Sequence, residues 1–563
     1  MARLGPKIFR GYYAVKFFFF RNERRARRAE GPKHGFVGIQ IDGLAYPHLL
    51  LALKGGYLPR VTKLLRRGHQ LREYQSGLPS TTPAAQSAIF YGDTSGIPAF
   101  RWYDKQRQQL ISCNDPDHVQ LFREQLFANR PGLLNGGASY SNILDGDATR
   151  SIFTVSSPHP QTLFGRFGGW RIQLLILLHP FRVIRMGFAS VIEYFTNILD
   201  CWHFRNTRPW RINEGLFPLI RIICNVLLRE FQTFGVIADI YSGVPYIYTT
   251  YSGYDELAHR FGPTSRAALK NLKYIDVRIG EIMRMLRYAP GIDYEIVIIS
   301  DHGQTPGYPF RDRFGATLGD TINAFLRKSS HLTVASGPLE MTQLKLDYLG
   351  DELRGQHNSW RQRSYRRWKK RVMRHIKELV PETHTIDTHG GVVITYSSTL
   401  AHLYLTDYSG RMSRREIEAE QPLLLDFLCH HKGIGFVVMA DDNEGIILRH
   451  QDDTIVHSPA QGFSAIAADS FIHTYGSPEE LLPMIYRFSR SPLCGDLIIF
   501  GDYDGQRIAC FDEQVGGHGS VGGEQLEPFL ILPGGHPLMN KERLSGHEFL
   551  YHELFKPLRD RRE

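Results

Sequence analysis

The fold of this chain is decided by two stretches, Tyr251-Ser-Gly-Tyr-Asp-Glu-Leu-Ala-His259 and Ile296-Val-Ile-Ile-Ser-Asp-His-Gly303. Short runs of β-branched or aromatic residues, Tyr246–Tyr251 and Glu295–Ser300, lead into the polar ends of these stretches. Such runs predict buried strands of a mostly parallel sheet. Ala267–Leu286 lies between them and has the apolar spacing of an amphipathic helix. Together the three segments predict a right-handed strand–helix–strand unit and an α/β fold.

Acidic and imidazole side chains come directly after both predicted strands. Asp255 and His259 follow the first strand, and Asp301 and His302 follow the second. In open α/β sheets, ligands collect outside the carboxyl ends of the strands. Carboxylate oxygen and imidazole nitrogen are the ligand set of Zn²⁺ or Mn²⁺ sites. The pattern therefore predicts a dinuclear metal site at this edge of the sheet.

The first part of the chain predicts a further strand and helix. His34–Ile41 is rich in Val and Ile and predicts a strand that ends in Asp42-Gly43, although Asp-Gly after a strand is most often a simple turn. Leu58–Leu71 has the apolar spacing of a helix. Later apolar runs predict additional strands, namely Gly391–Tyr396, His402–Thr406, Gly435–Ala440, Asp496–Asp502 and Phe529–Leu532.

A turn rich in Pro and hydroxyl side chains begins at Leu78 and opens into a predicted helix that reaches Gly92. Thr82 lies close to the N-terminus of this helix. A helix N-terminus presents free N–H groups and a partial positive charge, which suits a phosphoryl group. We therefore treat the Thr82 hydroxyl as a candidate functional group.

Composition is that of a globular protein. The chain has 563 residues, of which 42% are hydrophobic, and its six cysteines are scattered without a CxxC pair, so neither a disulfide framework nor a structural zinc is predicted. No apolar run approaches the ~18 residues of a transmembrane helix. The run Phe17–Phe20 is too short for a signal peptide. We expect a cytoplasmic protein, and two basic segments leave peripheral membrane attachment open.

These basic segments account for the net charge of +10. Residues 1–35 hold ten Lys or Arg against Glu23 and Glu30, and residues 354–377 hold ten and no acid, so the remainder is mildly acidic. Residues 357–377 also repeat apolar side chains at multiples of four, which predicts a basic amphipathic helix. Such a helix either binds an anionic membrane surface or packs its aromatic stripe on the body. No recognisable module supports nucleic-acid binding, and the oligomeric state is not predicted.

Seven residues follow in one order along the chain. A strand-end Asp-Gly, a Thr in a helix-opening turn, Asp-x-x-x-His, Ser-Asp-His-Gly and Gly-x-His-Gly supply Asp42, Thr82, Asp255, His259, Asp301, His302 and His518. This order and spacing resemble the alkaline phosphatase superfamily, and in particular its type I phosphodiesterase/nucleotide pyrophosphatase branch. The resemblance spans roughly Gly35 to Pro533. Its most specific motifs are Asp301-His302-Gly303 and Asp255-x-x-x-His259 with Gly262-Pro263.

The resemblance implies a doubly wound, mostly parallel sheet with helices on both faces and two divalent metal ions, Zn²⁺ first, with Mn²⁺ or Fe open. By position, one ion would be held by Asp42, Thr82, Asp301 and His302, and the other by Asp255, His259 and His518. A small phosphorylated substrate is implied. Thr82 would attack its phosphorus to form a phosphothreonine, and water on the second metal would hydrolyse that intermediate.

The same resemblance sets the expected domain limits. A catalytic domain would run over residues 34–545, between a basic amphipathic arm (1–33) and a basic C-terminal tail (546–563). Within it, residues 171–235 are helical and aromatic and predict a helical insert or cap beside the sheet. Residues 330–380 are polar and Arg-rich and predict a second insertion.

Two positions leave alternatives. Thr81 competes with Thr82 as nucleophile, but the family's Thr lies ten residues before the Gly at the helix end, and Thr82 to Gly92 has this spacing. The family's phosphate-contacting Asn is replaced by Phe100, and the adjacent Arg101 is either a phosphate clamp or a surface residue.

The leading hypothesis is a phosphoesterase for phosphodiester or nucleotide pyrophosphate-type substrates. The missing Asn keeps phosphomonoester or phosphonate hydrolysis open. A phosphotransferase or mutase on the same scaffold is a further alternative, as is a catalytically degenerate, basic, membrane-associated binding protein.

Overall fold

The computed structural model describes residues 4–94, 96–157, 180–207, 221–326, 331–335, 391–442, 445–458 and 466–561. The Arg-rich segment 354–377 and most of the predicted insertion 330–380 lie outside these residues, as do parts of the predicted insert 171–235.

The central sheet contains seven described strands in the order β2-β19-β8-β1-β7-β5-β6. In this order the strands are β2 (His69–Glu73), β19 (Phe529–Pro533), β8 (Asp293–Ile299), β1 (His34–Ile41), β7 (Tyr246–Tyr251), β5 (Ala138–Tyr140) and β6 (Arg150–Ile152). Pairs from β8 to β6 are parallel, and only β19 runs antiparallel to its two neighbours. The predicted mostly parallel α/β sheet is confirmed.

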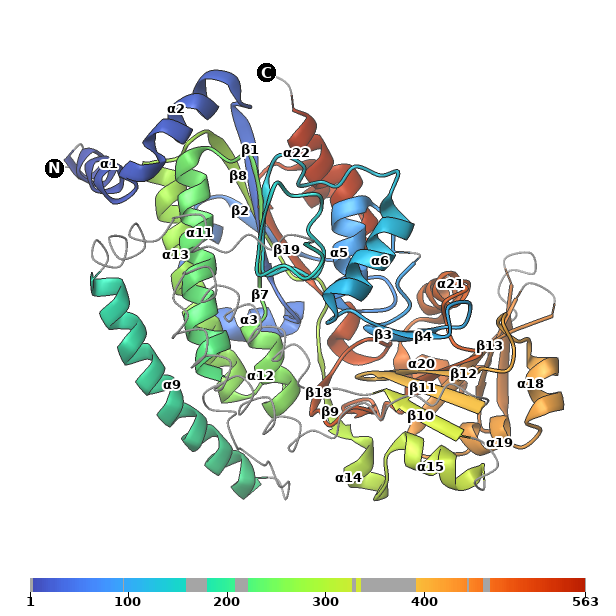
Figure 1. Cartoon of the computed structure of the whole chain (residues 1–563). Coiled ribbons are helices and arrows are strands. Elements are labelled where there is room, and N and C mark those ends of the chain that lie inside the picture. The colour runs from blue at the N-terminus through green and yellow to red at the C-terminus, as the bar shows by residue number, and fades with distance from the viewer. Residues whose placement is uncertain are drawn as a thin grey trace, which may run out of the picture.

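Helices cover both faces of this sheet, as Figure 1 shows, with α11 (Arg229–Ser242) and α13 (Arg266–Tyr288) on one side and α5 (Thr82–Tyr91) and α22 (Lys556–Asp560) on the other. The inner strands β1 and β7 are buried on both faces, whereas the edge strand β2 is polar and partly exposed. In β1, for example, every residue after His34 is buried. The predicted crossover helix forms as α13, with Ser265 accepting a hydrogen bond from the N–H of Ala268 at its start.

One helix is shorter than the sequence predicts. Leu58–Leu71 was expected to be continuous, but α4 (Pro59–Leu65) ends before Gly68, whose φ of +101° is left-handed, and β2 begins at His69. The chain turns there because β2 pairs with β19, a strand more than 450 residues further on. Sequence periodicity carries no signal of that pairing.

Of the later predicted strands, Phe529–Leu532 becomes β19 of the central sheet, and the other four belong to a second sheet, which the sequence did not separate from the first. Its order is β10-β11-β12-β16-β13-β14-β15, and its pairs are antiparallel except β10 with β11. The strands are β10 (His331–Ala335), β11 (Gly391–Ser397), β12 (Leu400–Leu405), β16 (Leu497–Gly501), β13 (Ile434–Ala440), β14 (Ile446–His450) and β15 (Asp453–His457). The helices that precede or connect these strands along the chain are α14 (Phe310–Phe314), α15 (Leu318–Phe325), α18 (Arg414–Glu420), α19 (Leu424–Cys429), α20 (Ile472–Tyr475) and α21 (Pro478–Ser489).

A small three-stranded sheet, β17-β9-β18, brings together segments that lie between the two large sheets in the sequence. It consists of β17 (Ile508–Cys510), β9 (Thr305–Pro309) and β18 (Gly516–Gly517). Because β9 follows Asp301-His302 and β18 precedes His518, their antiparallel pairing draws these two segments together.

Both chain ends pack on the body. In the N-terminal arm, α1 (Leu4–Lys16) and α2 (Arg21–Glu30) bury the aromatic side chains of Tyr13, Phe17 and Phe20. Arg28 Nε donates to the carbonyl of Gly291 at 2.9 Å. In the C-terminal segment 546–563, Phe555 is buried against Phe36 of β1, with 5.0 Å between the ring centroids.

Of the predicted insert 171–235, residues 180–207 form the long helix α9 (Pro180–Thr207), and the last residues belong to α11, which packs on β7. Within the described part of the chain, no helix is both long enough and apolar enough to cross a membrane. Cys113, Cys201, Cys429, Cys494 and Cys510 are buried and form no disulfide with one another.

Candidate active site

The carboxyl ends of three adjacent strands create the site. Gln40 of β1 lies opposite Ile299 of β8, and Ile41 lies opposite Tyr251 of β7, so the three strands end at the same level. Asp42 and Asp301 therefore emerge beside each other. After β7 the chain enters α12 (Gly253–Phe261), which carries Asp255 and His259 one turn apart.

The first cluster contains Asp42, Asp301 and His302, whose ligand atoms all lie within 4.8 Å of one another. His302 Nε2 is 3.7 Å from Asp42 Oδ1 and 3.5 Å from Asp301 Oδ2. Thr82 Oγ1 donates to Asp42 Oδ1 at 3.1 Å and lies 3.2 Å from His302 Nε2. The four residues assigned to one metal by position thus meet in space.

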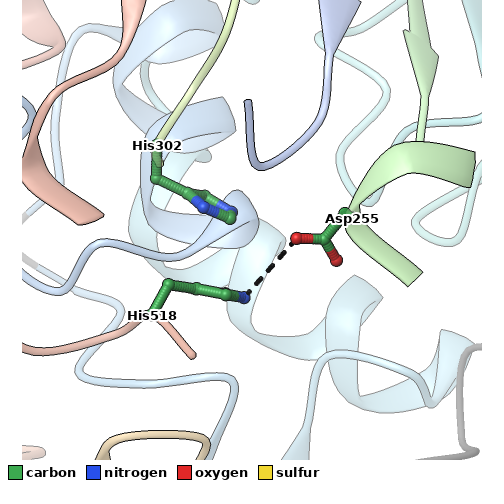
Figure 2. A group of neighbouring side chains, drawn as sticks. All are labelled: Asp255, His302 and His518. Atoms are coloured by element: carbon green, nitrogen blue, oxygen red, sulfur yellow. Dashed lines mark ion pairs between the residues drawn. The ribbon is translucent and has the colours of Figure 1, made fainter. Parts of the chain in front are cut away.

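The second cluster contains Asp255, His259 and His518. His259 Nε2 lies 3.2 Å from Asp255 Oδ2 and 3.2 Å from His518 Nε2, and His518 Nε2 lies 3.9 Å from Asp255 Oδ1. Figure 2 shows the rings of His302 and His518 both directed toward Asp255. The two rings stack with 3.9 Å between centroids. Because of this stacking, His302 also falls within ligand distance of Asp255 and His518, and the two clusters adjoin.

The orientation of the three imidazoles suits metal binding. In His259, His302 and His518, Nδ1 faces a backbone carbonyl, that of Gly516, Gly303 and Ser80 respectively, at 2.7–3.0 Å. A carbonyl can only accept a hydrogen bond, so each Nδ1 carries the proton and each Nε2 directs a lone pair into the cluster. Metal-bound histidines are commonly fixed in this way.

The buried charges also fit cations. Asp42 and Asp301 are buried side by side, and Asp301 Oδ2 accepts no hydrogen bond from the described residues. Burial, followed by the charge of Asp301, raises the pKa of Asp42 well above its usual range. A buried carboxylate without an opposite charge is strongly disfavoured, and divalent cations held by these oxygen and nitrogen atoms would supply that charge.

The second cluster has an internal charge balance. Burial would raise the pKa of Asp255, but the facing imidazoles, His259 foremost, outweigh burial and lower it. Burial opposes protonation of His259, yet Asp255 raises its pKa above the ordinary value. Burial and the neighbouring His302 lower the pKa of His518 well below the ordinary value, which keeps this ring neutral. Neutral imidazole is the form that coordinates a metal.

The two threonines at the start of α5 differ in surroundings. Thr82 is partly exposed, and its hydroxyl points at Asp42 and His302. Thr81 is the N-cap residue, is 1% exposed, and its buried hydroxyl has no hydrogen-bond partner among the described residues. Only the Thr82 hydroxyl is therefore in contact with the first cluster.

Arg101 lies at the start of β3 (Arg101–Asp104) rather than on the surface, with 4% of its side chain area exposed. Its Nη1 donates to the carbonyl of Tyr396 in β11 at 3.0 Å, which joins the hairpin of β3 and β4 (Gln109–Ser112) to the second sheet. A role for Arg101 in binding phosphate stays a prediction.

Sequence reasoning missed the residues that support the ligands. Gln304 Nε2 donates to the backbone oxygen of Asp255 at 3.1 Å and to its carboxylate. Gln304 thereby fixes the position of Asp255, a residue of the second cluster. Ser80 accepts from His518 through its carbonyl, and its hydroxyl accepts from the N–H of Gly519. Gln304 follows Asp301-His302-Gly303 directly, and Ser80 lies two residues before Thr82, so proximity to a motif was the available signal.

A family match gives the class of this enzyme, a phosphoester hydrolase. A sequence model of the type I phosphodiesterase/nucleotide pyrophosphatase family matches residues 36–387, more than half of the chain. The chain belongs to this family. The resemblance stated from the motifs is thereby confirmed, and so is the class of enzyme.

Solved structures give distant matches. They include murine ectonucleotide pyrophosphatase/phosphodiesterase 5 in an inactive form with AMP, at 11% identity and a TM-score of 0.46, covering 93% of this chain and 95% of that one. Phosphonoacetate hydrolase from Sinorhizobium meliloti with phosphonoacetate has 14% identity, a TM-score of 0.45 and coverage of 94% and 96%. The alkaline phosphatase PafA has 11% identity, a TM-score of 0.47 and coverage of 93% and 96%. A comparison with curated protein sequences gave no match. At these identities, substrate and mechanism rest on the site itself.

Gly43 lets the chain segment that carries Asp42 lie close to Asp255. Its φ is +68°, and a Cβ at this position would lie 2.2 Å from Asp255 Oδ1. A side chain here would therefore displace a proposed ligand as well as strain the backbone. Gly56 offers a matched control, because its φ is +71° and a Cβ there would meet nothing within 4 Å.

We predict that Gly43→Ala abolishes hydrolysis, whereas Gly56→Ala leaves it intact. Both variants should lose about 1 kcal/mol of unfolding free energy, since each places Ala in a left-handed conformation. Urea denaturation measures the shared loss, and hydrolysis of an aryl phosphate ester measures the difference. If the two variants were equally active, a displacement of Asp255 would be shown not to impair hydrolysis.

Proposed function

We propose that this chain hydrolyses phosphodiester or nucleotide pyrophosphate-type substrates through a covalent phosphothreonine on Thr82, at a site that holds two divalent metal ions. The observation that carries the proposal is the position of the Thr82 hydroxyl. It lies at the N-terminus of α5 and contacts both a carboxylate and an imidazole of the first cluster.

The covalent step follows from this geometry. As Thr82 Oγ1 forms a bond to phosphorus, the bond between phosphorus and the leaving-group oxygen breaks, and the hydroxyl proton is directed toward Asp42 Oδ1. The leaving alcohol or phosphate departs with a proton from solvent. Water then attacks the phosphothreonine, and phosphate or a phosphate monoester is released as the Thr82 hydroxyl is restored.

The N-terminus of α5 supports the substrate. Its first N–H groups have no partners within the helix, and the helix dipole places partial positive charge beside Thr82. A phosphoryl group bound there is held in line with the attacking hydroxyl. The family supports a diester or pyrophosphate substrate. Phe100, which stands where many relatives have a phosphate-contacting Asn, favours monoester hydrolysis as the second candidate.

We predict that Thr82→Ala lowers kcat by several orders of magnitude, because positioning alone cannot replace a nucleophile. Thr82→Ser should retain a large part of the activity, since it keeps the hydroxyl. Steady-state kinetics on aryl phosphate mono- and diesters measure both effects and show which ester is preferred. Acid-quenched wild-type enzyme should carry phosphate on the peptide that contains Thr82.

Thr81→Ala is the control, because it removes a hydroxyl of the same kind one residue away. It should be far milder, since the Thr81 hydroxyl has no hydrogen-bond partner among the described residues. Phosphate on Thr81 would move the nucleophile by one residue. Full activity of Thr82→Ala would replace the covalent route by direct attack of water.

Two metal ions fit the donor set. Asp42, Thr82, Asp301 and His302 would hold one ion, and Asp255, His259 and His518 the other. When bound, the ions lower the pKa of oxygen nucleophiles and neutralise the charge on the attacking and leaving oxygens. Three imidazoles among seven donors favour Zn²⁺, and Mn²⁺ or Fe are the alternatives.

We predict close to two transition-metal ions per chain in the purified protein, and a loss of about one ion in His518→Ala, because a catalytic zinc is held by three protein ligands and His518 is one of the three here. Elemental analysis counts both. His402→Ala is the control, since His402 is buried but bonds to the carbonyl of Pro98 away from the clusters. An unchanged metal content in His518→Ala would remove that residue from the site.

We further propose that the basic N-terminal arm (1–33) attaches the enzyme peripherally to an anionic membrane, together with segment 354–377. On α1, the apolar side chains of Ile8, Tyr12 and Val15 are more than half exposed. The arm also exposes basic residues, Lys7 and Arg10 on α1 and Arg21, Arg25 and Arg28 on α2. This mixture of basic and aromatic side chains suits a negatively charged lipid surface.

We predict that binding to vesicles of phosphatidylcholine and phosphatidylglycerol weakens sharply as salt rises, because salt screens the attraction. The double variant Arg21→Glu/Arg25→Glu should weaken binding, by about 1 kcal/mol or more for each residue. Vesicle sedimentation measures both. Arg415→Glu/Lys432→Glu makes the same charge change at exposed positions near the second sheet and should have little effect. Equal binding of the two double variants would exclude the arm.

A further inference from the structure

The outward face of α9 is almost entirely apolar. Its exposed side chains follow helical spacing at Ile184, Phe188, Val191, Ile192, Phe195, Leu199 and Trp202, and each is more than half exposed. Over these residues the helix is about 27 Å long. Figure 1 shows α9 at the outer edge of the molecule, beyond α13. A contiguous apolar surface of this extent marks an interaction site.

The inward face of α9 is polar and charged. Glu193, Asn197 and Asp200 lie on it at intervals of four and three residues, and all three contact the buried guanidinium of Arg221. The distances from the three guanidinium nitrogens are 2.6, 3.1 and 3.0 Å. Lys270 of α13 also donates to Thr196 Oγ1, at 3.2 Å.

A further ion-pair group holds the first part of α9. Arg185 donates to Glu230 of α11 at 3.0 Å and to Glu281 of α13 at 2.9 Å. The helix is therefore attached to the body by hydrogen bonds and ion pairs, and its charged groups are matched internally. This polarity is the reverse of that of a surface helix in water, which buries its apolar stripe and exposes its polar one.

We propose that the outward face of α9 inserts into the interfacial region of a lipid bilayer. Acyl chains accept an apolar surface without hydrogen bonds, and the face offers few. Over residues 184–203, the part of α9 whose side chains the structure describes, the exposed side chains other than Arg185 and His203 are apolar or the Tyr194 phenol. Trp202 and Tyr194 are of the types that concentrate at membrane interfaces. The inward polar face means that α9 lies in the membrane plane and does not span the bilayer.

Charge selects a lipid surface over a second copy of the chain. The basic arm lies on the same side of the molecule as α9, the side of α11 and α13 (Figure 1). An anionic bilayer is attracted to that side, whereas two chains that meet there, each with a net charge of +10, repel each other. A protein interface would also carry a polar rim around its apolar centre.

The contact has a direct connection to the active site. Arg221, which holds three side chains of α9, lies with its Cζ 5.9 Å from the ring centre of Phe261. Phe261 is the last residue of α12, the helix that carries Asp255 and His259. A bilayer bound to α9 would thus be separated from an element of the site by α9 and Arg221. The lipid contact itself stands without the proposed reaction.

The test uses the full chain, vesicles of phosphatidylcholine with phosphatidylglycerol, and Leu199→Ser against Leu423→Ser. The two leucines are 63% and 66% exposed, and only Leu199 lies on α9. Leu199→Ser should lower vesicle binding about tenfold, because a leucine that enters the bilayer loses its contact with water. Leu423→Ser should bind as the wild type does. In high salt the wild type should keep a fraction of its binding that Leu199→Ser lacks.

Trp202 supplies a second measurement. Lipids brominated on their acyl chains should quench part of the tryptophan fluorescence of the wild type, and Trp202→Phe should lower that quenching. Equal binding of the two leucine variants, with no quenching specific to Trp202, would overturn the proposal. A wild-type dimer that Leu199→Ser dissociates would assign the face to a second copy. A monomer that binds no vesicles would leave a segment of the chain itself as its cover, again against the proposal. Hydrolysis of a soluble aryl phosphate by each variant confirms the fold.

Discussion

Three carboxylates, those of Asp42, Asp255 and Asp301, meet at the ends of neighbouring strands in a place with little access to water. Their mutual repulsion is only partly relieved by the imidazoles beside them, since His518 is kept neutral. The arrangement persists because the parallel strands fix where each chain segment emerges. Hydrogen bonds from Gln304 and to Ser80 then hold the ligands in place. The charge that makes the apo arrangement unfavourable is what gives it affinity for cations.

How much the sequence could predict depended on the range of each interaction. The strands before Asp42, Asp255 and Asp301 are continuous apolar runs, so they and the site edge were predictable from local pattern. Gly-x-His518-Gly has no such local signal and was found only by resemblance. The second sheet was missed as a separate unit because antiparallel partners such as Leu403 and Leu497 are distant in sequence. Gln304 could not be assigned to Asp255, since that contact arises only from the packing of α12 against the start of β9.

α9 illustrates a different limit. Its sequence predicts a helix, and the same spacing of apolar residues would ordinarily predict which face is buried. The opposite face is buried because Arg221 enters between the helix and the body and binds three side chains at once. A single arginine can therefore determine which side of an amphipathic helix faces outward. The exposed residues of α1 repeat the same combination of aromatic and aliphatic side chains.

The position of β19 in the central sheet affects how the protein is made. This strand comes from the last part of the chain yet lies between β2 and β8, which are synthesised far earlier. Until β19 has left the ribosome, the edge of β8 that β19 will cover is unpaired. Such an edge readily joins a strand of another molecule. His518 is also translated late, so an incomplete chain has neither a closed sheet nor a second metal cluster. A nascent chain of this protein therefore carries an open sheet edge from the synthesis of β8 until that of β19.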